Sequence, residues 1–306
     1  HTGRPKIMKF EGGYHGMSAE ALMSLAPKRL QNFPQPVPDS AGIPATVEAD
    51  MLIAPFNDAD FAAGMIDEYG DKIAGVIVEP LQRLIPPAPA FLETLRAKTA
   101  ERGIVLIFDE VVTGFRLAWG GAQERYGVVP DLCTLGKIIG GGLPLAAIAG
   151  CESIMCHFDE KAVGEEGFTF QIGTLSGNPL AAVAGLATLD VLDRPGSYER
   201  LKEVGTRLMT AAHDALDAVG IPHQIVGDPT LFDVIFSANP VLNYRDMMAA
   251  DSQRAAVFNA AMRSRGILKP GAKTYPHLAL DEADILQTID AYRYAAGQVA
   301  AMPAAS

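Results

Sequence analysis

The chain has 306 residues but only three cysteines and one tryptophan. Three cysteines are too few for a disulfide framework, which predicts free thiols and a reducing compartment. Cys151, Cys156 and His157 stand close together, but no second Cys or His pair follows that would complete a zinc site. We therefore expect a cytoplasmic protein with no bound metal.

Positive charge and long apolar runs are also scarce. The 25 Lys and Arg residues are outnumbered by 36 Asp and Glu residues, giving a net charge of −11. Because binding to phosphates needs clustered basic side chains, this balance argues against nucleic acid as the main partner. No apolar run is long enough to span a bilayer and no signal peptide is present, so we expect no membrane partner.

What the chain does have is the composition of a globular protein, with 49% hydrophobic and 20% charged residues. Short apolar runs alternate with helical patterns. The runs predict strands over residues 73–78, 104–108, 131–135 and 145–149, and the patterns predict helices over residues 89–101, 119–126 and 178–192. This alternation predicts an α/β fold with a mostly parallel central sheet, flanking helices and right-handed crossovers.

The pattern changes after Pro195 and Gly196, which break the chain. Beyond them, helices are expected over residues 197–219, 251–265 and 281–302, and strands over residues 231–236 and 275–279. We therefore expect two domains. Residues 1–194 form a large α/β domain, and residues 195–306 form a small C-terminal α+β domain.

Polar side chains stand where three of the expected strands end. Glu79 follows the first strand, Asp109 and Glu110 follow the second, and Lys137 comes shortly after the third. In an open α/β sheet, ligands bind in the crevice at the carboxyl ends of the strands. The sequence therefore predicts that these carboxylates and the lysine converge on one edge of the sheet.

Lys137 lies beside a glycine-rich turn, which allows two interpretations. The first is phosphate binding, but the P-loop pattern is absent because Ile138 follows the lysine and no glycine stands five residues before Gly136. The second is a lysine that forms a Schiff base, with Asp109 as the acid partner of a pyridinium nitrogen. Burial at a strand end would favour the proton loss that this chemistry requires.

Two further glycine motifs are candidates for ligand contacts. In residues 13–16, Tyr14 offers a flat face for stacking and His15 a hydrogen bond, although a plain turn would also explain the motif. Residues 173–179 offer amides and hydroxyls for a phosphate just before the expected helix. The alternative is that Ser176 and Asn178 only cap that helix.

Together these residues resemble the class III pyridoxal-phosphate-dependent aminotransferases of fold type I. Within that family they are most similar to the branch of glutamate-1-semialdehyde 2,1-aminomutase and related transaminases. The matching stretches follow the order of the family and cover almost the whole chain: residues 10–16, 78–80, 108–116, 130–131, 135–142, 173–179 and 243–246.

The resemblance implies an enzyme that uses pyridoxal 5′-phosphate, and it implies a role for each matching residue. Lys137 would form the Schiff base with the cofactor, and Asp109 would pair with its pyridine nitrogen. Tyr14 would stack on one face of the ring, Val111 would pack on the other face, and His15 would lie beside the ring.

The resemblance also implies a homodimer with a shared active site. Gly173 and Thr174 would bind the phosphate of the neighbouring subunit's cofactor, and Glu79 would be an orienting or gating carboxylate in the pocket. The family's own phosphate-binding segment should stand shortly before residues 2–4, but the chain starts at His1. We therefore expect that the N-terminal part of the large domain is missing here.

Three substrate-pocket positions depart from the aminomutases. Arg83 and Leu84 stand in place of a Gly-Asn pair, Phe170 stands in place of Tyr, and residues 270–275 lack an acid. We therefore expect an aminotransferase that moves an amino group from an amine or amino acid to a keto acceptor by a ping-pong mechanism. Arg83 could bind a substrate carboxylate and Phe170 an apolar substrate group. The alternatives are the intramolecular aminomutase and a non-catalytic truncated relative.

Overall fold

The computed structural model describes residues 1–303, and the chain divides into two compact units. The first unit consists of His1–Arg83 and Pro87–Asp193, and the second of Leu84–Pro86 and Arg194–Ser306. Pro195 and Gly196, which break the sequence pattern, come directly after this division.

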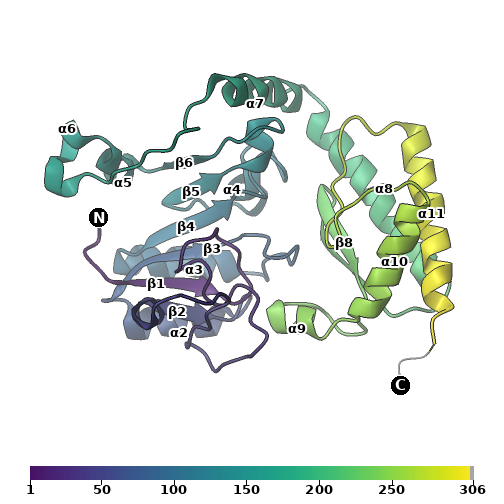
Figure 1. The fold of residues 1–306 in the computed structure, drawn as a ribbon, viewed down its shortest axis with the longest axis horizontal. Coiled ribbons are helices and arrows are strands. Elements are labelled where there is room, and N and C mark those ends of the chain that lie inside the picture. Colours follow the sequence, from purple (N-terminus) through teal and green to yellow (C-terminus); the bar gives the residue numbers. More distant parts are fainter. Residues whose placement is uncertain (304–306) are drawn as a thin grey trace. The chain divides into compact units, whose positions relative to one another are not determined.

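The first unit is built on a six-stranded sheet, which Figure 1 shows with the strand order β2-β1-β3-β4-β5-β6. The strands are β1 (Lys6–Phe10), β2 (Met51–Ala54), β3 (Ile73–Val78), β4 (Val105–Glu110), β5 (Leu132–Leu135) and β6 (Ala147–Gly150). The first five are parallel to one another, and β6 alone runs antiparallel, against β5. The prediction of a mostly parallel central sheet flanked by helices is confirmed.

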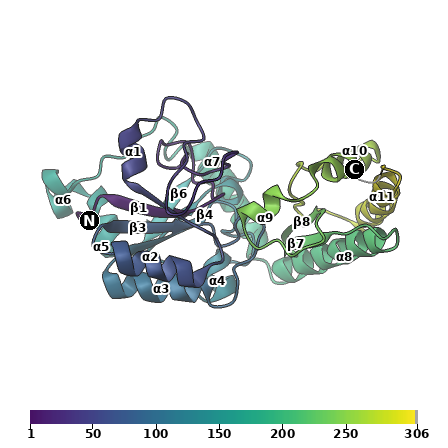
Figure 2. The ribbon, with the colours of Figure 1, turned by 90° about the horizontal axis from the view of Figure 1, so that it is seen from below.

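Buried apolar side chains hold this sheet to its helices. The longer helices are α2 (Ala59–Tyr69), α3 (Phe91–Arg102), α4 (Gly121–Tyr126) and α7 (Pro179–Leu192), and the shorter ones are α1 (Ala45–Ala49), α5 (Glu152–Met155) and α6 (Glu160–Val163). Figure 2 shows α2 and α3 along one face of the sheet. Between them and the sheet, the rings of Phe10, Phe56 and Phe91 pack edge to face with centroids 5.0–6.1 Å apart.

The ends of these helices follow from the sequence. The carboxylate of Asp58 accepts a hydrogen bond from the amide of Phe61 at the start of α2. Asn178 does the same for Ala181 at the start of α7, where Pro179 takes the first turn. α3 ends at Gly103, whose φ of 59° suits a glycine.

The edge of the sheet at β6 and the outer face of α7 are exposed in the single chain. A strand was expected over residues 145–149, and all four residues of the observed β6 are exposed. On α7, Leu180, Val183 and Leu186 are 62–75% exposed, at helical spacing on one face. An apolar strand and an apolar helix face are therefore left uncovered by this chain.

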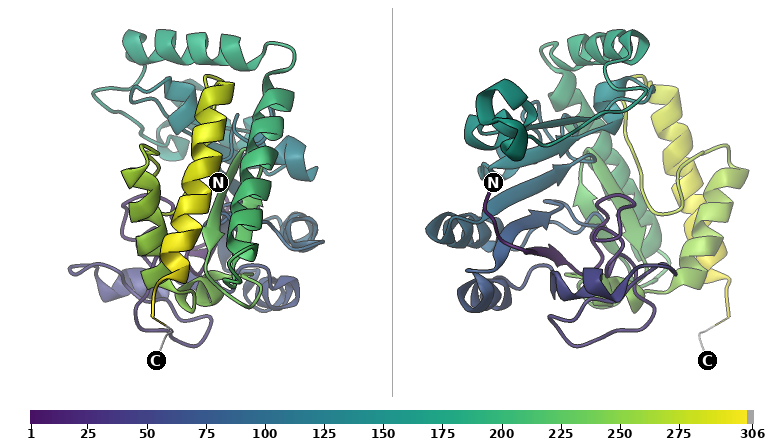
Figure 3. Two further views of the ribbon diagram at one scale, coloured as in Figure 1. Left: turned by 90° about the vertical axis from the view of Figure 1, so that its right-hand side faces the viewer. Right: turned by 60° about the vertical axis from the view of Figure 1, so that its left-hand side comes forward.

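The second unit contains both helices and strands. Its elements are α8 (Ser197–Asp217), β7 (Gln224–Asp228), β8 (Leu231–Ile235), α9 (Tyr244–Met248), α10 (Ser252–Ser264) and α11 (Glu282–Ala300). β7 and β8 form an antiparallel hairpin, and Figure 3 shows α8, α10 and α11 as neighbouring helices. Phe232, Phe258 and Tyr292 form the centre of the core that joins them.

The prediction of a strand over residues 275–279 is wrong. Thr274 pairs its backbone with Phe232 as an isolated bridge, and the pairing goes no further. Pro276 has no N–H to continue a ladder, which accounts for the early end. Within residues 1–303, no helix combines the length and the hydropathy needed to cross a membrane.

Candidate functional site

Four adjacent parallel strands bring the candidate residues to one edge of the sheet. The chain leaves β1 into the loop with Tyr14 and His15, and it leaves β3 at Glu79. Asp109 is the next-to-last residue of β4 and is the register partner of Thr134 on β5. Lys137 follows two residues after the end of β5. The predicted convergence at the carboxyl ends of the strands is therefore what the sheet order produces.

Asp109 is a buried carboxylate that accepts three hydrogen bonds. Its Oδ2 atom lies 2.8 Å from Nδ1 of His15, and its Oδ1 atom accepts from the amide of Val111 and the hydroxyl of Thr134, each at 3.1 Å. Burial by itself would raise the pKa of Asp109, but the bond to His15 and the bonds from Val111 and Thr134 hold that pKa below its ordinary value. Asp109 is therefore ionised at neutral pH.

His15 is fixed by this carboxylate on one side and by a glycine on the other. A carboxylate can only accept, so Nδ1 of His15 carries the hydrogen between them. The ring is only 4% exposed. A Cβ atom on Gly13 would lie 2.8 Å from Nε2 of His15 and 3.1 Å from the carbonyl oxygen of Phe10. Glycine is thus required at position 13 to admit the ring.

Gln82 also lies next to Gly13, and it was not predicted as a site residue. Its side chain is fully buried, and its Nε2 atom donates to the carbonyl of Glu11 at 2.8 Å. That bond fixes the amide so that Oε1 faces the position of the Gly13 Cβ, 3.2 Å from it. Among residues 1–303, neither Oε1 of Gln82 nor Nε2 of His15 has a hydrogen-bond partner. Two buried polar atoms next to Gly13 are therefore available for hydrogen bonds to a ligand.

Tyr14 and Glu79 are joined through the backbone. The amide of Tyr14 donates to Oε1 of Glu79 at 2.9 Å, while the Tyr14 side chain is 48% exposed at the edge of the sheet. Behind them, Lys9 is 1% exposed and donates to the carbonyl of Ala21 at 2.7 Å. Burial lowers the pKa of Lys9 to about 8, against the opposing charges of Glu79 and Asp39.

Lys137 adopts a backbone conformation that lysine rarely takes. Its φ is +49°, in the left-handed region, at the start of a short 3₁₀ helix over Lys137–Gly140. Such a conformation carries strain that functional sites often retain. The preceding Gly136 packs against Val111, because a Cβ there would lie 3.2 Å from its Cγ1 atom. The burial expected for Lys137 is wrong for the single chain, since its side chain leaves the sheet edge into solvent.

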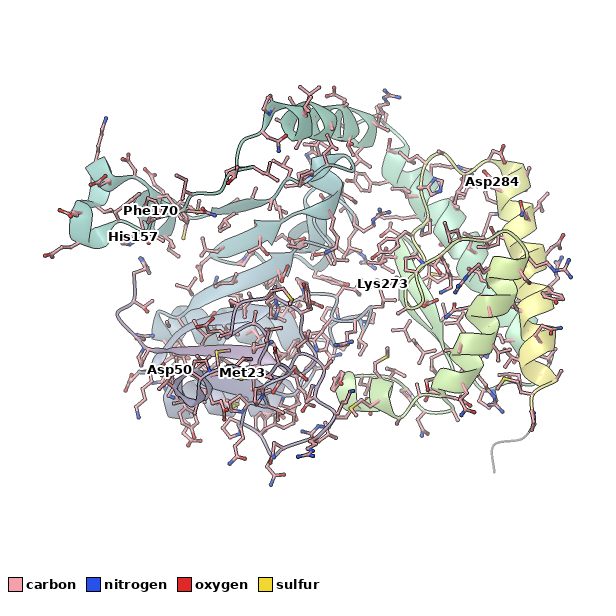
Figure 4. All side chains as sticks on the ribbon, viewed as in Figure 1. Met23, Asp50, His157, Phe170, Lys273 and Asp284 are labelled. Carbon is pink, nitrogen blue, oxygen red and sulfur yellow. The ribbon has the colours of Figure 1, made fainter. Side chains whose placement is uncertain are left out.

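The segment with Phe170, Gly173 and Thr174 lies on the exposed part of the unit. Phe170 is 74% exposed and packs edge to face on Phe168, and Figure 4 shows it beside His157. Gly173 accepts a backbone bond from Ser176 in the turn before α7. Within residues 1–303, neither Gly173 nor Thr174 hydrogen-bonds to Asp109, His15 or Lys137. The phosphate role of this segment remains a prediction.

Arg83 connects two loops through its guanidinium group. Its Nε atom donates to the carbonyl of Gly12 and its Nη2 atom to that of Leu25, both at 2.7 Å. Its φ of 50° is left-handed, as is that of Leu84 at 72°. Two of its donors are therefore used within the fold, and a substrate role for Arg83 remains a prediction.

Glu110 has a structural role next to Asp109. Its Oε2 atom accepts from the hydroxyl of Thr113 at 3.0 Å and from the amide of Ala122 at 2.6 Å, and its Oε1 atom accepts from Gln123. It thereby holds the start of α4. In the described part of the chain, no group of three or more His, Cys, Asp or Glu residues could hold a metal ion.

Known proteins are similar to this chain in sequence and in fold. Residues 1–290 match the family described as Aminotransferase class-III. The chain is 41% identical over 297 residues to a glutamate-1-semialdehyde 2,1-aminomutase 2 of Brevibacillus brevis, covering 95% of this chain and 67% of that protein. The chain therefore spans about two thirds of the length of that relative.

Solved structures show the same fold. An omega-transaminase from Sphaerobacter thermophilus superposes with a TM-score of 0.88 at 34% identity, covering 97% of this chain and 69% of the other. A transaminase described as having PLP bound superposes with a TM-score of 0.86 at 26% identity, covering 98% and 69%. The fold is that of fold type I pyridoxal-phosphate transaminases.

The residues at the sheet edge fit pyridoxal phosphate. A carboxylate offers about four lone-pair sites, and Asp109 uses three, so one remains for a protonated ring nitrogen. The two buried atoms without partners, on His15 and Gln82, suit the polar substituents of such a ring. Tyr14 offers an exposed aromatic face, and Lys137 an exposed amine.

The match over residues 1–290, the 41% identical relative and the shared fold agree with one another. The chain belongs to the class III aminotransferases, which are enzymes that use pyridoxal phosphate.

Proposed function

We propose that this chain is an aminotransferase that moves an amino group from an amine or amino acid to a keto acceptor in two half-reactions. The observation that carries this proposal is the placement of an ionised, buried carboxylate, Asp109, one strand away from the backbone-strained Lys137. A buried anion and an exposed amine at one sheet edge are the two groups that amino transfer needs from the protein.

The bound cofactor supplies an aldehyde carbon and an aromatic ring that stabilises a carbanion next to the transferred nitrogen. Lys137 would hold the cofactor covalently through Nζ. When released, the same amine would take the proton from the donor's carbon and return it, and such general base catalysis is typically worth about 10²–10⁴-fold. Its exposure at the sheet edge leaves it free to move between these positions.

Asp109 would keep a proton on the ring nitrogen. Its charge is maintained because His15 and Thr134 donate to it and lower its pKa. His15 therefore orients Asp109 from one side of the site. Gln82, whose amide is held by the carbonyl of Glu11, would orient the ring. Tyr14, positioned by Glu79 through its amide, would stack on the ring, and Val111 would pack on the opposite face.

We also propose a homodimer, in which Gly173 and Thr174 bind the phosphate at the partner's site. The support is the uncovered apolar surface of β6 and of α7, including Leu180, Val183 and Leu186. Exposed apolar surface of this kind is typical of association between subunits. The turn before α7, which would bind the phosphate, is also exposed, and this suits a role outside its own subunit. A cytoplasmic location is proposed from the three free thiols.

An intramolecular aminomutase is the second candidate, because the relative from Brevibacillus brevis carries that name. We favour intermolecular transfer because Arg83, Leu84 and Phe170 replace residues that the aminomutases keep. Arg83 holds a left-handed conformation, in which a glycine would be unstrained.

Dependence on a keto acceptor separates the two functions. The cofactor-loaded protein is mixed with an amino donor, with and without a keto acid, and the keto product of the donor is quantified. An aminotransferase yields about one equivalent of product per site without the acceptor and many equivalents with it. An aminomutase instead converts glutamate-1-semialdehyde in many turnovers with no second substrate, and that result would overturn the proposal.

A further inference from the structure

The second unit contains a pair of histidines that lies outside the site described above. His213 stands near the end of α8, and His223 immediately precedes β7. Nδ1 of His213 lies 2.8 Å from Nε2 of His223, and the two ring planes are inclined by 51°. His213 is exposed to solvent and His223 is half-buried. Two imidazole nitrogens therefore face each other at the surface.

The hydrogen atoms of this pair are fixed by a backbone carbonyl. Nδ1 of His223 lies 2.7 Å from the carbonyl oxygen of Ile221, which can only accept, so this nitrogen carries a hydrogen. Nε2 of neutral His223 is then a lone pair directed at His213, and Nδ1 of His213 donates to it. A histidine whose second nitrogen donates to a backbone carbonyl is oriented in the way that metal ligands usually are.

We infer that His213 and His223 form a two-histidine site for a divalent transition-metal ion, with water in the remaining positions. Metal–imidazole bonds are about 2.0–2.1 Å long, so two ligands at right angles place their nitrogens about 2.9 Å apart. Tetrahedral coordination would need about 3.3 Å. The observed 2.8 Å therefore suits neighbouring positions of a square or octahedral ion, Cu(II) or Ni(II), better than Zn(II).

Metal binding here requires no net loss of protons from the neutral pair. The hydrogen on Nδ1 of His213 moves to its Nε2 atom, which leaves Nδ1 as the second ligand. Because His213 is exposed, its Nε2–H can be hydrated. The ion would connect the end of α8 to the residues before β7, across a turn that includes Gly220 with a φ of +67°. It would thus stabilise the second unit.

The test uses the cofactor-loaded, untagged protein with Cys151→Ser and Cys156→Ser, which removes the accessible thiols that Cu(II) would oxidise. Ni(II) affinity is measured by calorimetry, and Cu(II) coordination by electron paramagnetic resonance. His213→Gln and His223→Gln are each expected to weaken Ni(II) binding about tenfold or more, equivalent to about 1.4 kcal/mol. The matched control is His277→Gln, which removes an exposed histidine of the same unit and leaves the affinity unchanged.

The Cu(II) spectrum of the parent protein gives a result that does not depend on any variant folding. We expect superhyperfine splitting from two imidazole nitrogens in the parent protein and from one imidazole nitrogen in either pair variant. A parent spectrum with one nitrogen or none would overturn the inference. The same conclusion would follow from equal Ni(II) affinities in the parent and both pair variants, with the ion bound adventitiously elsewhere.

Discussion

Nδ1 of His15 lies 2.8 Å from Oδ2 of Asp109, with both side chains less than a tenth exposed. His15 is in the loop after β1 and Asp109 is in β4, 94 positions later in the sequence. Their contact links the loop after β1 to the end of β4, and it keeps a negative charge inside the protein. The chemistry proposed for the site depends on that charge.

Replacing Asp109 with Asn is expected to leave cofactor binding measurable but to make amino transfer very slow. Asn keeps the size of the side chain but cannot hold a proton on a ring nitrogen, and losing a buried charge pair typically costs about 2–5 kcal/mol. Single-turnover deprotonation of the donor is the measurement. Asp67→Asn, a surface carboxylate paired with Lys98, serves as control. Near-normal rates in Asp109→Asn would contradict the assigned role.

Gly13→Ala is expected to displace His15 and to destabilise the protein by about 1–3 kcal/mol. The new methyl group would lie 2.8 Å from Nε2 of His15 and 3.1 Å from a backbone oxygen, which cannot move easily. Urea unfolding and cofactor affinity are measured together. In the control Gly64→Ala, the helical site has nothing within 4 Å and the change should be neutral or stabilising. Equal behaviour of the two variants would exclude the close packing of Gly13 against His15.

Lys9 predicts a specific dependence of stability on pH. Burial lowers its pKa from 10.5 to about 8, so between these values the unfolded chain binds more protons than the folded chain. Stability contributed by this group therefore rises with pH. Relative to Lys9→Met, the wild type should gain about 2–3 kcal/mol between pH 7 and pH 10. The measurement is urea unfolding of both proteins at each pH, and a constant difference would mean that Lys9 titrates normally.

Lys137→Ala is expected to abolish amino transfer while the fold is retained. Lys137→Arg should fail as well, because a guanidinium group stays protonated and cannot form an imine. Activity is assayed beside far-ultraviolet circular dichroism, with Lys161→Ala, an exposed lysine of α6, as the control. More than trace activity in Lys137→Ala would show that another group carries the chemistry.

The sequence predicted those parts of the fold and site that depend on local patterns. β3 was predicted over its full length, because Ile73–Val78 is a continuous apolar run. β1 was missed, since Lys6 and Lys9 interrupt its apolar pattern and only tertiary packing buries Lys9. The sequence alone could not tell whether β6 is exposed, because a surface that can be covered by another subunit has the same apolar sequence as a core.

In the site, too, contacts between segments far apart in the sequence could not be predicted from local sequence patterns. Glu79, Asp109 and Lys137 could be identified as strand-end residues, but their order at the sheet edge follows from the strand order. Gln82 had one usable signal, its place three residues after Glu79. Its bond to the carbonyl of Glu11, 71 positions away, could not be inferred from its neighbours.

The central claim is that Lys137 is the residue that binds the cofactor covalently. The direct test is to add pyridoxal phosphate to the protein, reduce it with borohydride, and map the labelled peptide by mass spectrometry. We predict a single pyridoxyl group on Lys137 at about one per chain, and none on that peptide in Lys137→Ala. A stable label on a different lysine, or no label at saturating cofactor, would contradict the assignment.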